Sequence, residues 1–245
     1  MAFPGLSARQ RRVRRLTAVL AALLVAAAAA WAVFVSPLLA VDRIEVTGTS
    51  LVDRDQVRSR LEALRGTPLP RVGSDDAREL LEGTPGVREV TSVALPPTGV
   101  EVRVDELAPA ARADDVADGV LLADGSVLTG VAEETLDQAR GQAGPLPRMT
   151  PGLMAAGPDV RAAAAAVLTG LPPAVAGRVT GVDAQTPEQV ELTLEDGPLL
   201  VWGDASRPAA KAAVVEAFLA EDGSGTAVRG VDELDVSVPE RPLTR

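Results

Sequence analysis

The longest apolar segment of the chain lies near its amino terminus. Residues 16–35 contain no charged side chain, and this run of 20 residues forms a helix about 30 Å long, the thickness of a bilayer's hydrocarbon core. The segment before it is basic, with Arg9, Arg11, Arg12, Arg14 and Arg15. The pattern predicts a cytoplasmic tail at 1–15 and a transmembrane helix at 16–35, because arginines are retained on the cytoplasmic side.

A cleavable signal peptide is the alternative interpretation of this segment. Its apolar part is usually about 7–15 residues long, shorter than the run at 16–35. The cleavage pattern after Leu38, Leu39 and Ala40 is also poor. An anchor is therefore favoured, and residues from about 36 to 245 are expected outside the cytoplasm.

One strand and two helices are predicted after the apolar segment. Residues 41–46 alternate loosely and precede a turn, as a strand does. Asp53 is expected to cap the first helix and Ser74 the second. Each helix has an apolar face, formed by Val57, Leu61 and Leu64 in the first and by Ala77, Leu80 and Leu81 in the second. These faces need a sheet to pack against.

The sheet is completed by two further strands. Residues 87–95 are rich in valine, and residues 100–105 alternate cleanly between valine and charged side chains. The order strand, helix, helix, strand, strand at 41–106 predicts a three-stranded sheet with both helices on one face.

Hairpins and helices alternate in the residues after 113. Asp124 and Gly125 are expected to form a two-residue type I′ turn, and Ser206 is expected to cap a helix that ends at Leu219. Another helix is predicted at 159–168, and strands are predicted at 120–123, 127–128, 179–182, 190–194, 199–202 and 234–238. The pattern predicts a second, mixed β domain with helices at 113–239 and a tail at 240–245. The fold class is therefore α+β.

The composition excludes most kinds of active site. The chain contains no His, Cys or Tyr, which removes the Ser-His-Asp and Cys-His nucleophile systems and the usual zinc sites. Lys211 is its only lysine, and a solvated or snorkelling side chain is expected there. No phosphate-binding glycine loop is present. We therefore predict no catalytic residue, no cofactor and no metal.

The charge of the chain limits its partners. Residues after 35 hold all 34 acidic side chains and 19 of the 24 basic ones, a net charge of −15. Such a surface repels nucleic acid and anionic lipid. Few aromatic side chains are available to bind a small-molecule or glycan substrate. Binding to other proteins is the class of function that remains favoured.

Several motifs make the chain resemble the FtsQ/DivIB family of cell-division proteins, in its actinobacterial form, with a POTRA domain at 41–106. They are VDRIEVTG at 41–48, TPGV at 84–87, LPPT at 95–98, VDELAPAA at 104–111 and the closing VDELDVSVPERPLTR at 231–245. Leu107 departs from the family, which commonly has arginine there. The resemblance covers nearly the whole chain, and the closing motif is its most specific part.

The resemblance implies a non-enzymatic scaffold of the division machinery. It implies a plasma-membrane protein at the septum whose partners are FtsB (DivIC) and FtsL, with the wall synthases FtsW and FtsI reached through them. In the family the last strand carries the FtsB contact. The matching positions are Asp235, Val236, Ser237, Val238 and Glu240. For Val236 and Val238, burial in the core is an equal alternative.

Two other functions stay open. A POTRA-bearing transport or secretion component is disfavoured, because neither a repeated module nor a β-barrel pattern is found. A wall-glycan hydrolase requires a carboxylate pair, for which Asp105 with Glu106, or Glu133 with Glu134, are the candidates.

Overall fold

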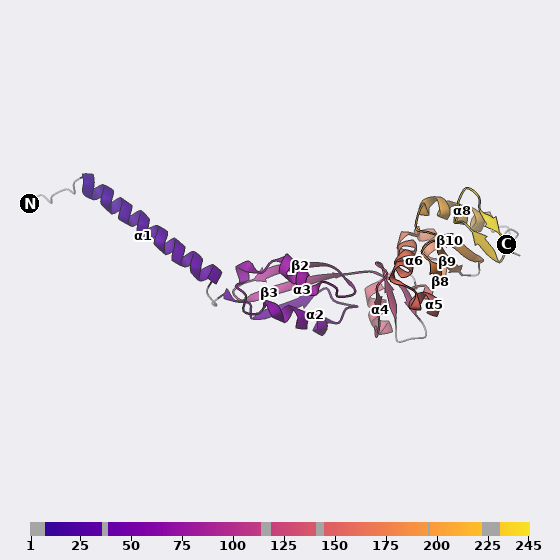
Figure 1. The fold of residues 1–245 in the computed structure, drawn as a ribbon, viewed down its shortest axis with the longest axis horizontal. Coiled ribbons are helices and arrows are strands. Elements are labelled where there is room, and N and C mark those ends of the chain that lie inside the picture. The colour runs from indigo at the N-terminus through magenta and orange to yellow at the C-terminus, as the bar shows by residue number, and fades with distance from the viewer. Residues whose placement is uncertain (1–7, 36–38, 114–118, 141–144, 196, 222–230) are drawn as a thin grey trace, which may run out of the picture. The chain divides into compact units, whose positions relative to one another are not determined.

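The chain forms two compact units. The computed structural model describes residues 8–35, 39–113, 119–140, 145–195, 197–221 and 231–245 (Figure 1). The first unit comprises residues 1–47, 55–82 and 89–104, and the second comprises residues 48–54, 83–88 and 105–245. Two loops, at 48–54 and 83–88, therefore belong to the second unit although they connect elements of the first.

Helix α1 begins at Ala8 and ends at Val35. Where its side chains are described, leucines, valines and Trp31 are exposed. Among the residues that the structure describes, no helix is both long and apolar enough to cross a membrane. The side chains at 8–13, 29–30 and 32–35, which include the predicted topology determinants Arg9, Arg11 and Arg12, lie outside the description. The transmembrane segment at 16–35 stays a prediction.

The first unit contains a three-stranded sheet in the order β1-β3-β2. β1 (Arg43–Thr47) runs parallel to β3 (Gly99–Glu106), and β2 (Val87–Leu95) lies on the other side of β3. Four helical segments join β1 to β2: α2 (Arg54–Leu61), η2 (Glu62–Leu64), η3 (Leu69–Arg71) and α3 (Ser74–Leu81). The predicted order of strand, helix, helix, strand and strand is confirmed.

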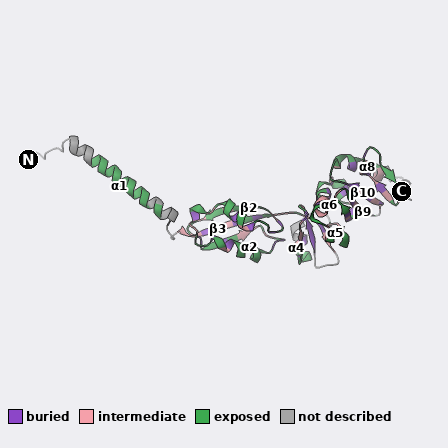
Figure 2. Ribbon diagram, viewed as in Figure 1, coloured by how far each residue is buried: buried purple, intermediate pink, exposed green. Residues whose placement is uncertain are grey.

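The predicted apolar faces of both helices are buried except at Leu80, which is half-buried. Buried segments of the helices and strands of this unit are shown in Figure 2. Val57 and Leu61 are fully buried on α2, and Leu64 follows in the next turn with 5% exposed. In β3 every second residue is buried, from Val100 to Val104. Each buried valine or leucine side chain contributes about 1.5–3 kcal/mol. The alternation in β3 therefore fixes the face that the sheet presents to the helices.

The start of α3 differs from the prediction. Gly73 precedes the first turn, and its N–H donates to the Asp76 carboxylate at 2.7 Å. The Ser74 hydroxyl instead accepts a hydrogen bond from the N–H of Ser92 in β2 at 2.9 Å. The prediction that Ser74 caps the helix is wrong, because its hydroxyl binds the backbone of Ser92, which lies 18 residues later. No local sequence pattern indicates this contact.

The second unit contains a nine-stranded sheet in the order β12-β11-β10-β9-β8-β7-β4-β5-β6. The strands are β4 (Pro109–Ala113), β5 (Val120–Leu122), β6 (Val127–Leu128), β7 (Arg148–Met149), β8 (Val179–Thr186), β9 (Gln189–Leu194), β10 (Leu199–Gly203), β11 (Glu233–Asp235) and β12 (Leu243–Thr244). The sheet is mixed: β11 with β10, β8 with β7 and β7 with β4 are parallel pairs, and its other pairs are antiparallel. The predicted mixed β domain is confirmed.

Five helices lie in the described part of this unit: α4 (Glu133–Arg140), α5 (Pro151–Ala155), α6 (Pro158–Gly170), α7 (Pro173–Ala176) and α8 (Pro208–Glu221). Of these helices only α6 and α8 were predicted, and of the strands β5, β6, β8, β9, β10 and β11 were predicted. The strands β7 and β12 have two residues each, too short for a period of two to show. Buried residues of α6 and α8 share one core with the strands, where Trp202 is fully buried.

The hairpin between β5 and β6 is not the predicted type I′ turn, which needs a positive φ at both central residues. Gly125 has φ +84°, whereas Asp124 is not among the residues with positive φ. The N–H of Leu122 donates to the Ser126 carbonyl, and the N–H of Gly125 donates to the Leu122 carbonyl. These bonds define a three-residue loop with glycine in the left-handed position, a common alternative. The sequence also predicts a turn at Asp196 and Gly197, and Asp196 lies outside the described residues.

We expect Leu61→Asp to unfold the first unit. The side chain is fully buried, and an unpaired buried carboxylate costs several kcal/mol, a large part of the stability of a domain. Hydrogen exchange of the β1–β3 amides measures the effect. Ser59→Asp is the control, because it adds the same charge at an exposed position of α2. Slow exchange retained in Leu61→Asp contradicts the assigned helix face.

We also expect Gly125→Ala to destabilise the second unit more than Gly130→Ala. Both glycines have positive φ, so both substitutions strain the backbone. A Cβ at position 125 lies 2.4 Å from backbone atoms of Ala162, whereas one at 130 has no atom within 4 Å. Thermal melts of the two variants isolate the steric contribution. Equal melting temperatures mean that α6 does not approach the hairpin as described.

Candidate partner-binding edge

The carboxyl-terminal segment forms one edge of the nine-stranded sheet. β11 pairs in parallel with β10, with Leu234 beside Leu200, and antiparallel with β12, with Asp235 beside Leu243. The predicted edge strand at 234–238 is therefore corrected. β11 ends at Asp235, and the predicted tail folds back as β12, the outermost strand. The sequence did not reveal β12 because two residues after a proline carry no periodicity.

Backbone hydrogen bonds attach β12 to β11. The N–H groups of Asp232 and Glu233 donate to the Arg245 carbonyl at 2.8 and 3.0 Å, and the Arg245 N–H donates to the Glu233 carbonyl at 3.0 Å. Alternate residues of a strand direct their backbone groups to opposite sides. Thr244 therefore presents its N–H and C=O away from β11. Outward backbone groups on an edge strand are a template for an added strand.

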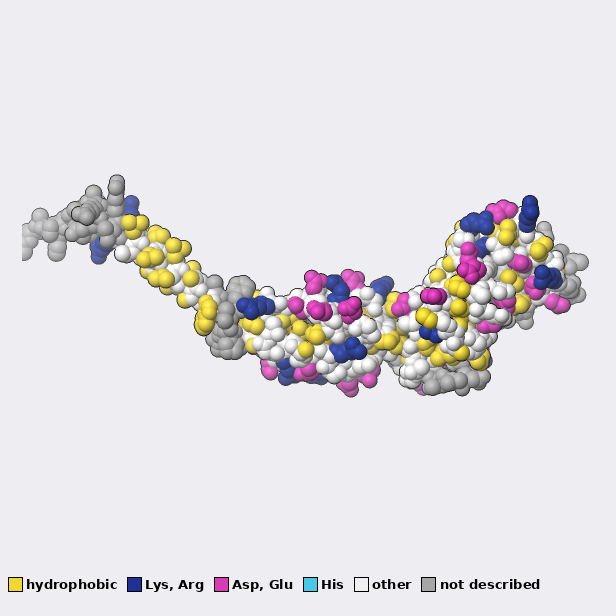
Figure 3. All heavy atoms as spheres, viewed as in Figure 1, with side chains coloured by type: hydrophobic (Ala, Val, Ile, Leu, Met, Phe, Trp, Pro, Cys, Tyr) yellow, Lys and Arg dark blue, Asp and Glu magenta, His cyan; other side chains and the backbone are white. Residues whose placement is uncertain are grey.

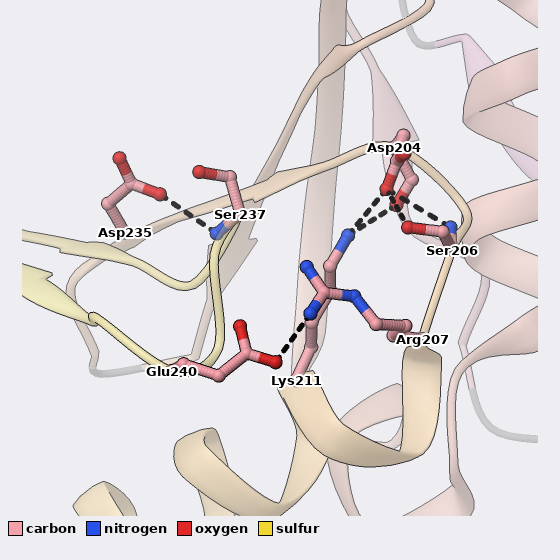
Figure 4. A network of polar contacts seen from close by, with 7 residues as sticks. All are labelled: Asp204, Ser206, Arg207, Lys211, Asp235, Ser237 and Glu240. Carbon is pink, nitrogen blue, oxygen red and sulfur yellow. Dashed lines mark hydrogen bonds and ion pairs between the residues drawn. The ribbon is translucent and has the colours of Figure 1, made fainter.

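The predicted partner-binding residues lie in different environments. Val236 is fully buried, as its alternative interpretation had it, whereas Val238 is 49% exposed. Asp235 accepts a hydrogen bond from the N–H of Ser237 at 2.9 Å (Figure 4). Ser237 also packs closely against β10, because a Cβ built on Gly203 lies only 2.9 Å from the Ser237 Cβ. Asp235 and Ser237 therefore shape the turn out of β11.

Glu240 forms an ion pair with Arg207, directly before α8 (Figure 4). The Arg207 guanidinium donates to the Glu240 carboxylate at 2.5 Å. The pKa of Glu240 is lowered first by its own backbone N–H and then by Arg207. The ion pair ties the turn after β11 to the loop between β10 and α8.

Lys211 is fully buried, so the prediction of a solvated or snorkelling side chain is wrong. Its Nζ donates to the Asp204 carboxylate at 2.8 Å and to the Asp204 carbonyl at 2.9 Å. It also lies 5.9 Å from the centroid of the Trp202 ring. A buried ammonium group is retained where a charged partner and hydrogen bonds offset its desolvation. The contact between Lys211 and Asp204 could not be predicted from the sequence, because Asp204 lies in the loop before α8 and not on the helix itself.

Asp204 organises the loop before α8. Hydrogen bonds lower the pKa of its carboxyl to about 2, chiefly the one from Lys211 and then the one from the Ser206 hydroxyl. The Ser206 hydroxyl donates to Asp204 at 2.7 Å, so Ser206 is not the predicted helix cap. The first amides of α8, those of Ala210 and Lys211, donate to the Arg207 carbonyl instead. Arg207 thus occupies the capping position.

Exposed large apolar side chains gather at this edge. Outside α1, the structure exposes such side chains in its described residues at three positions: Val93 with 52%, Val238 with 49% and Leu243 with 56%. Val238 and Leu243 both belong to the carboxyl-terminal segment, on either side of the turn at Glu240. A pair of apolar side chains beside free backbone groups is suited to binding a protein segment.

The candidate carboxylate pairs have structural roles. Glu106 accepts hydrogen bonds from the backbone N–H groups of Ser50, Leu51 and Val52 at 2.7–3.0 Å, and Glu133 forms an ion pair with Arg112 at 3.1 Å. Neither arrangement has the form of an acid and base facing a cleft. Among the residues described, no group of three or more His, Cys, Asp or Glu side chains is placed to hold a metal.

A hollow of about 530 Å³ lies over β7, β8 and β9 beside α5. Its lining includes Asp183, Glu191 and Met154. Burial raises the pKa of Glu191, and the nearby charges of Asp183 and Glu233 raise it further. Thr150 donates a short hydrogen bond to Asp183. The hydrogen bond from Thr150 therefore gives Asp183 a structural role in the wall of this hollow.

We expect the Asp204–Lys211 ion pair to weaken in acid. The folded pKa of about 2 lies below the ordinary value of about 3.9, so the stabilisation is present above about pH 4 and is lost as the pH falls towards 2. Asp204→Asn removes this contribution, so the thermal midpoint of the variant should change less between pH 4 and pH 2 than that of the unaltered chain. Asp232→Asn, at an exposed position, is the control. An unchanged pH profile in Asp204→Asn contradicts the assignment.

Comparisons with known proteins identify both parts of the chain. Residues 39–106 match the model of the POTRA domain, FtsQ-type, and residues 110–236 match that of the cell division protein FtsQ/DivIB, C-terminal. The cell division protein FtsQ of Streptomyces collinus is 32% identical over 250 residues, which are 96% of this chain and 89% of that protein. The tail from 237 lies beyond the second match.

Mycobacterial relatives are longer than this chain. The cell division protein FtsQ of Mycobacteroides abscessus is 30% identical over 219 residues, 86% of this chain and 63% of that protein. The one from Mycolicibacterium smegmatis is 28% identical, and 59% of it is covered. FtsQ proteins are non-enzymatic, which agrees with the expectation from the missing residue types. From the two matched domains and these relatives, the chain belongs to the FtsQ/DivIB family of cell division proteins.

Proposed function

We propose that this protein is a membrane-anchored scaffold of the division machinery that binds partner proteins through the edge formed by β11 and β12. The exposure of Val238 and Leu243 beside the outward backbone groups of β12 carries the proposal. Family membership supports a role in cell division.

Strand addition is the proposed mode of binding. A partner strand satisfies the outward N–H and C=O of Thr244, and its alternate side chains contact Leu243 and Val238. Of the residues predicted from the resemblance, Val238 then contacts the partner directly. Asp235, Ser237 and Glu240 hold the turn that presents it, and Val236 fixes β11 in the core.

The proposed partners are FtsB (DivIC) and FtsL, with the wall synthases FtsW and FtsI reached through them. Acidic side chains are spread over the visible surface and interspersed with basic ones (Figure 3). A net charge of −15 after residue 35 disfavours nucleic acid as a partner. A protein strand that pairs with backbone groups needs no strong opposite charge.

The anchor is α1, inserted in the plasma membrane at the septum. Supporting this, its described leucine and valine side chains, from Leu16 to Val25, are 58–69% exposed, which is unfavourable in water. Apolar side chains dominate its visible face (Figure 3). The arginines before it favour a cytoplasmic amino terminus. The residues that follow α1 then lie outside the cytoplasm.

We expect Thr244→Pro to weaken capture of FtsB- and FtsL-type ectodomains by the full-length chain. Proline removes the outward N–H of β12 while the bonds of Arg245 to β11 remain. Loss of one hydrogen bond and the added steric conflict predict roughly ten-fold weaker binding in a titrated pull-down. Undiminished capture moves the contact away from β12. Absence of capture by the unaltered chain rejects these partners.

Val238→Ser tests the apolar contact in the same titration. Removing a half-exposed valine from an interface costs about 1 kcal/mol, or about five-fold in affinity. Val93→Ser is a matched control, since Val93 is equally exposed but lies in β2 of the first unit. Equal losses in both variants argue against a contact specific to the carboxyl-terminal edge.

A further inference from the structure

Arg207 adopts a backbone conformation that its side chain does not favour. Its φ is +51°, and among the described residues other than glycine it is the one with positive φ. The left-handed conformation costs a residue with a Cβ roughly 1–2 kcal/mol, and glycine or asparagine adopts it more readily. A strained residue of this kind persists where the contacts around it hold its conformation, so those contacts need to be identified.

The Arg207 side chain reaches the turn between β11 and β12. It pairs with Glu240, which lies between the apolar residues Val238 and Leu243 in the sequence (Figure 4). The turn is closed by a hydrogen bond from the Arg241 N–H to the Val238 carbonyl at 2.9 Å. The ion pair therefore connects the turn to a side chain outside the carboxyl-terminal segment. This contact can fix the position of the turn.

The loop that carries Arg207 is itself fixed to the core. Asp204 is bound by the buried Lys211, whose nitrogen makes two hydrogen bonds to it. Gly203, with φ +80°, lets the loop leave β10 close to Ser237. Lys211 thus holds the loop at two points, through Asp204 and through its own backbone N–H, which donates to the Arg207 carbonyl at 3.2 Å, and the Arg207 side chain continues the contacts to Glu240.

We infer that Arg207 is a positioning residue for partner binding: it orders the turn at 238–241, so that β12 is held in register and Val238 and Leu243 face one partner together. This inference rests on the proposed function of the edge. Arg207 acts through Glu240, and it need not touch the partner. Nothing in the local sequence around Arg207 indicates this role, because Glu240 follows 33 residues later.

Arg207→Gly in the full-length chain tests the inference, because glycine suits the backbone at this position and removes only the side chain. The thermal midpoint should stay within about 2 °C, since relief of strain offsets the loss of an exposed ion pair. Exchange of the Asp232, Glu233 and Arg245 amides should become several-fold faster. Affinity for the FtsB-type ectodomain should fall about five-fold, the size that an exposed ion pair supplies.

Glu240→Gln should reproduce both changes, and the double variant should add nothing further, because the two residues act through one contact. The charge-swapped pair, Arg207→Glu with Glu240→Arg, should restore slow hydrogen exchange and affinity.

Unchanged hydrogen exchange and affinity in Arg207→Gly overturn the inference. A fall in thermal midpoint large enough to explain the lost binding overturns it as well. If the unaltered chain captures no ectodomain, the proposed function fails, whereas the exchange data still decide whether Arg207 orders the turn.

Discussion

The pairing of β11 with β10 is the interaction on which the carboxyl-terminal edge depends. β11 has only three residues, and it comes from a segment that follows α8 and the residues at 222–230. Leu234 and Val236 are buried in the core shared with Leu200 and Trp202, so apolar burial holds the strand in place. The chain has no cysteine and cannot fix this segment with a disulfide. That burial therefore sets the place from which the turn and β12 continue.

The loop between β10 and α8 combines two features that are unfavourable alone. Lys211 places a positive charge in the first turn of α8, where the helix dipole disfavours it, and buries that charge. Asp204 offsets both effects, because its carboxylate supplies the opposite charge beside the same turn. Arg207 adds backbone strain. The loop therefore depends on the contacts of Asp204 with Lys211 and of Arg207 with Glu240.

How far the sequence predicts the structure depends on the range of the interactions. Val57 and Leu61, or the valines of β3, could be assigned because their period and burial follow from local geometry. Ser74 and Ser206 were assigned as caps on the same local basis, yet each hydroxyl serves a different contact. The burial of Lys211, its link to Asp204 and the pairing of Arg207 with Glu240 depend on tertiary packing. The edge was predicted in the right segment but on the wrong strand, because β12 is too short to have a pattern.

The shortness of β12 bears on how such an edge avoids unwanted pairing. A long, flat, apolar edge strand invites self-association, and natural proteins shorten such edges or place charges and prolines on them. β12 has two residues, Pro242 precedes it, and Arg245 follows it in an ion pair with Glu233. Its few backbone groups can supply little binding energy alone. A partner must then also contact Val238 and Leu243, and that requirement makes the edge selective for a strand with apolar side chains in the matching positions.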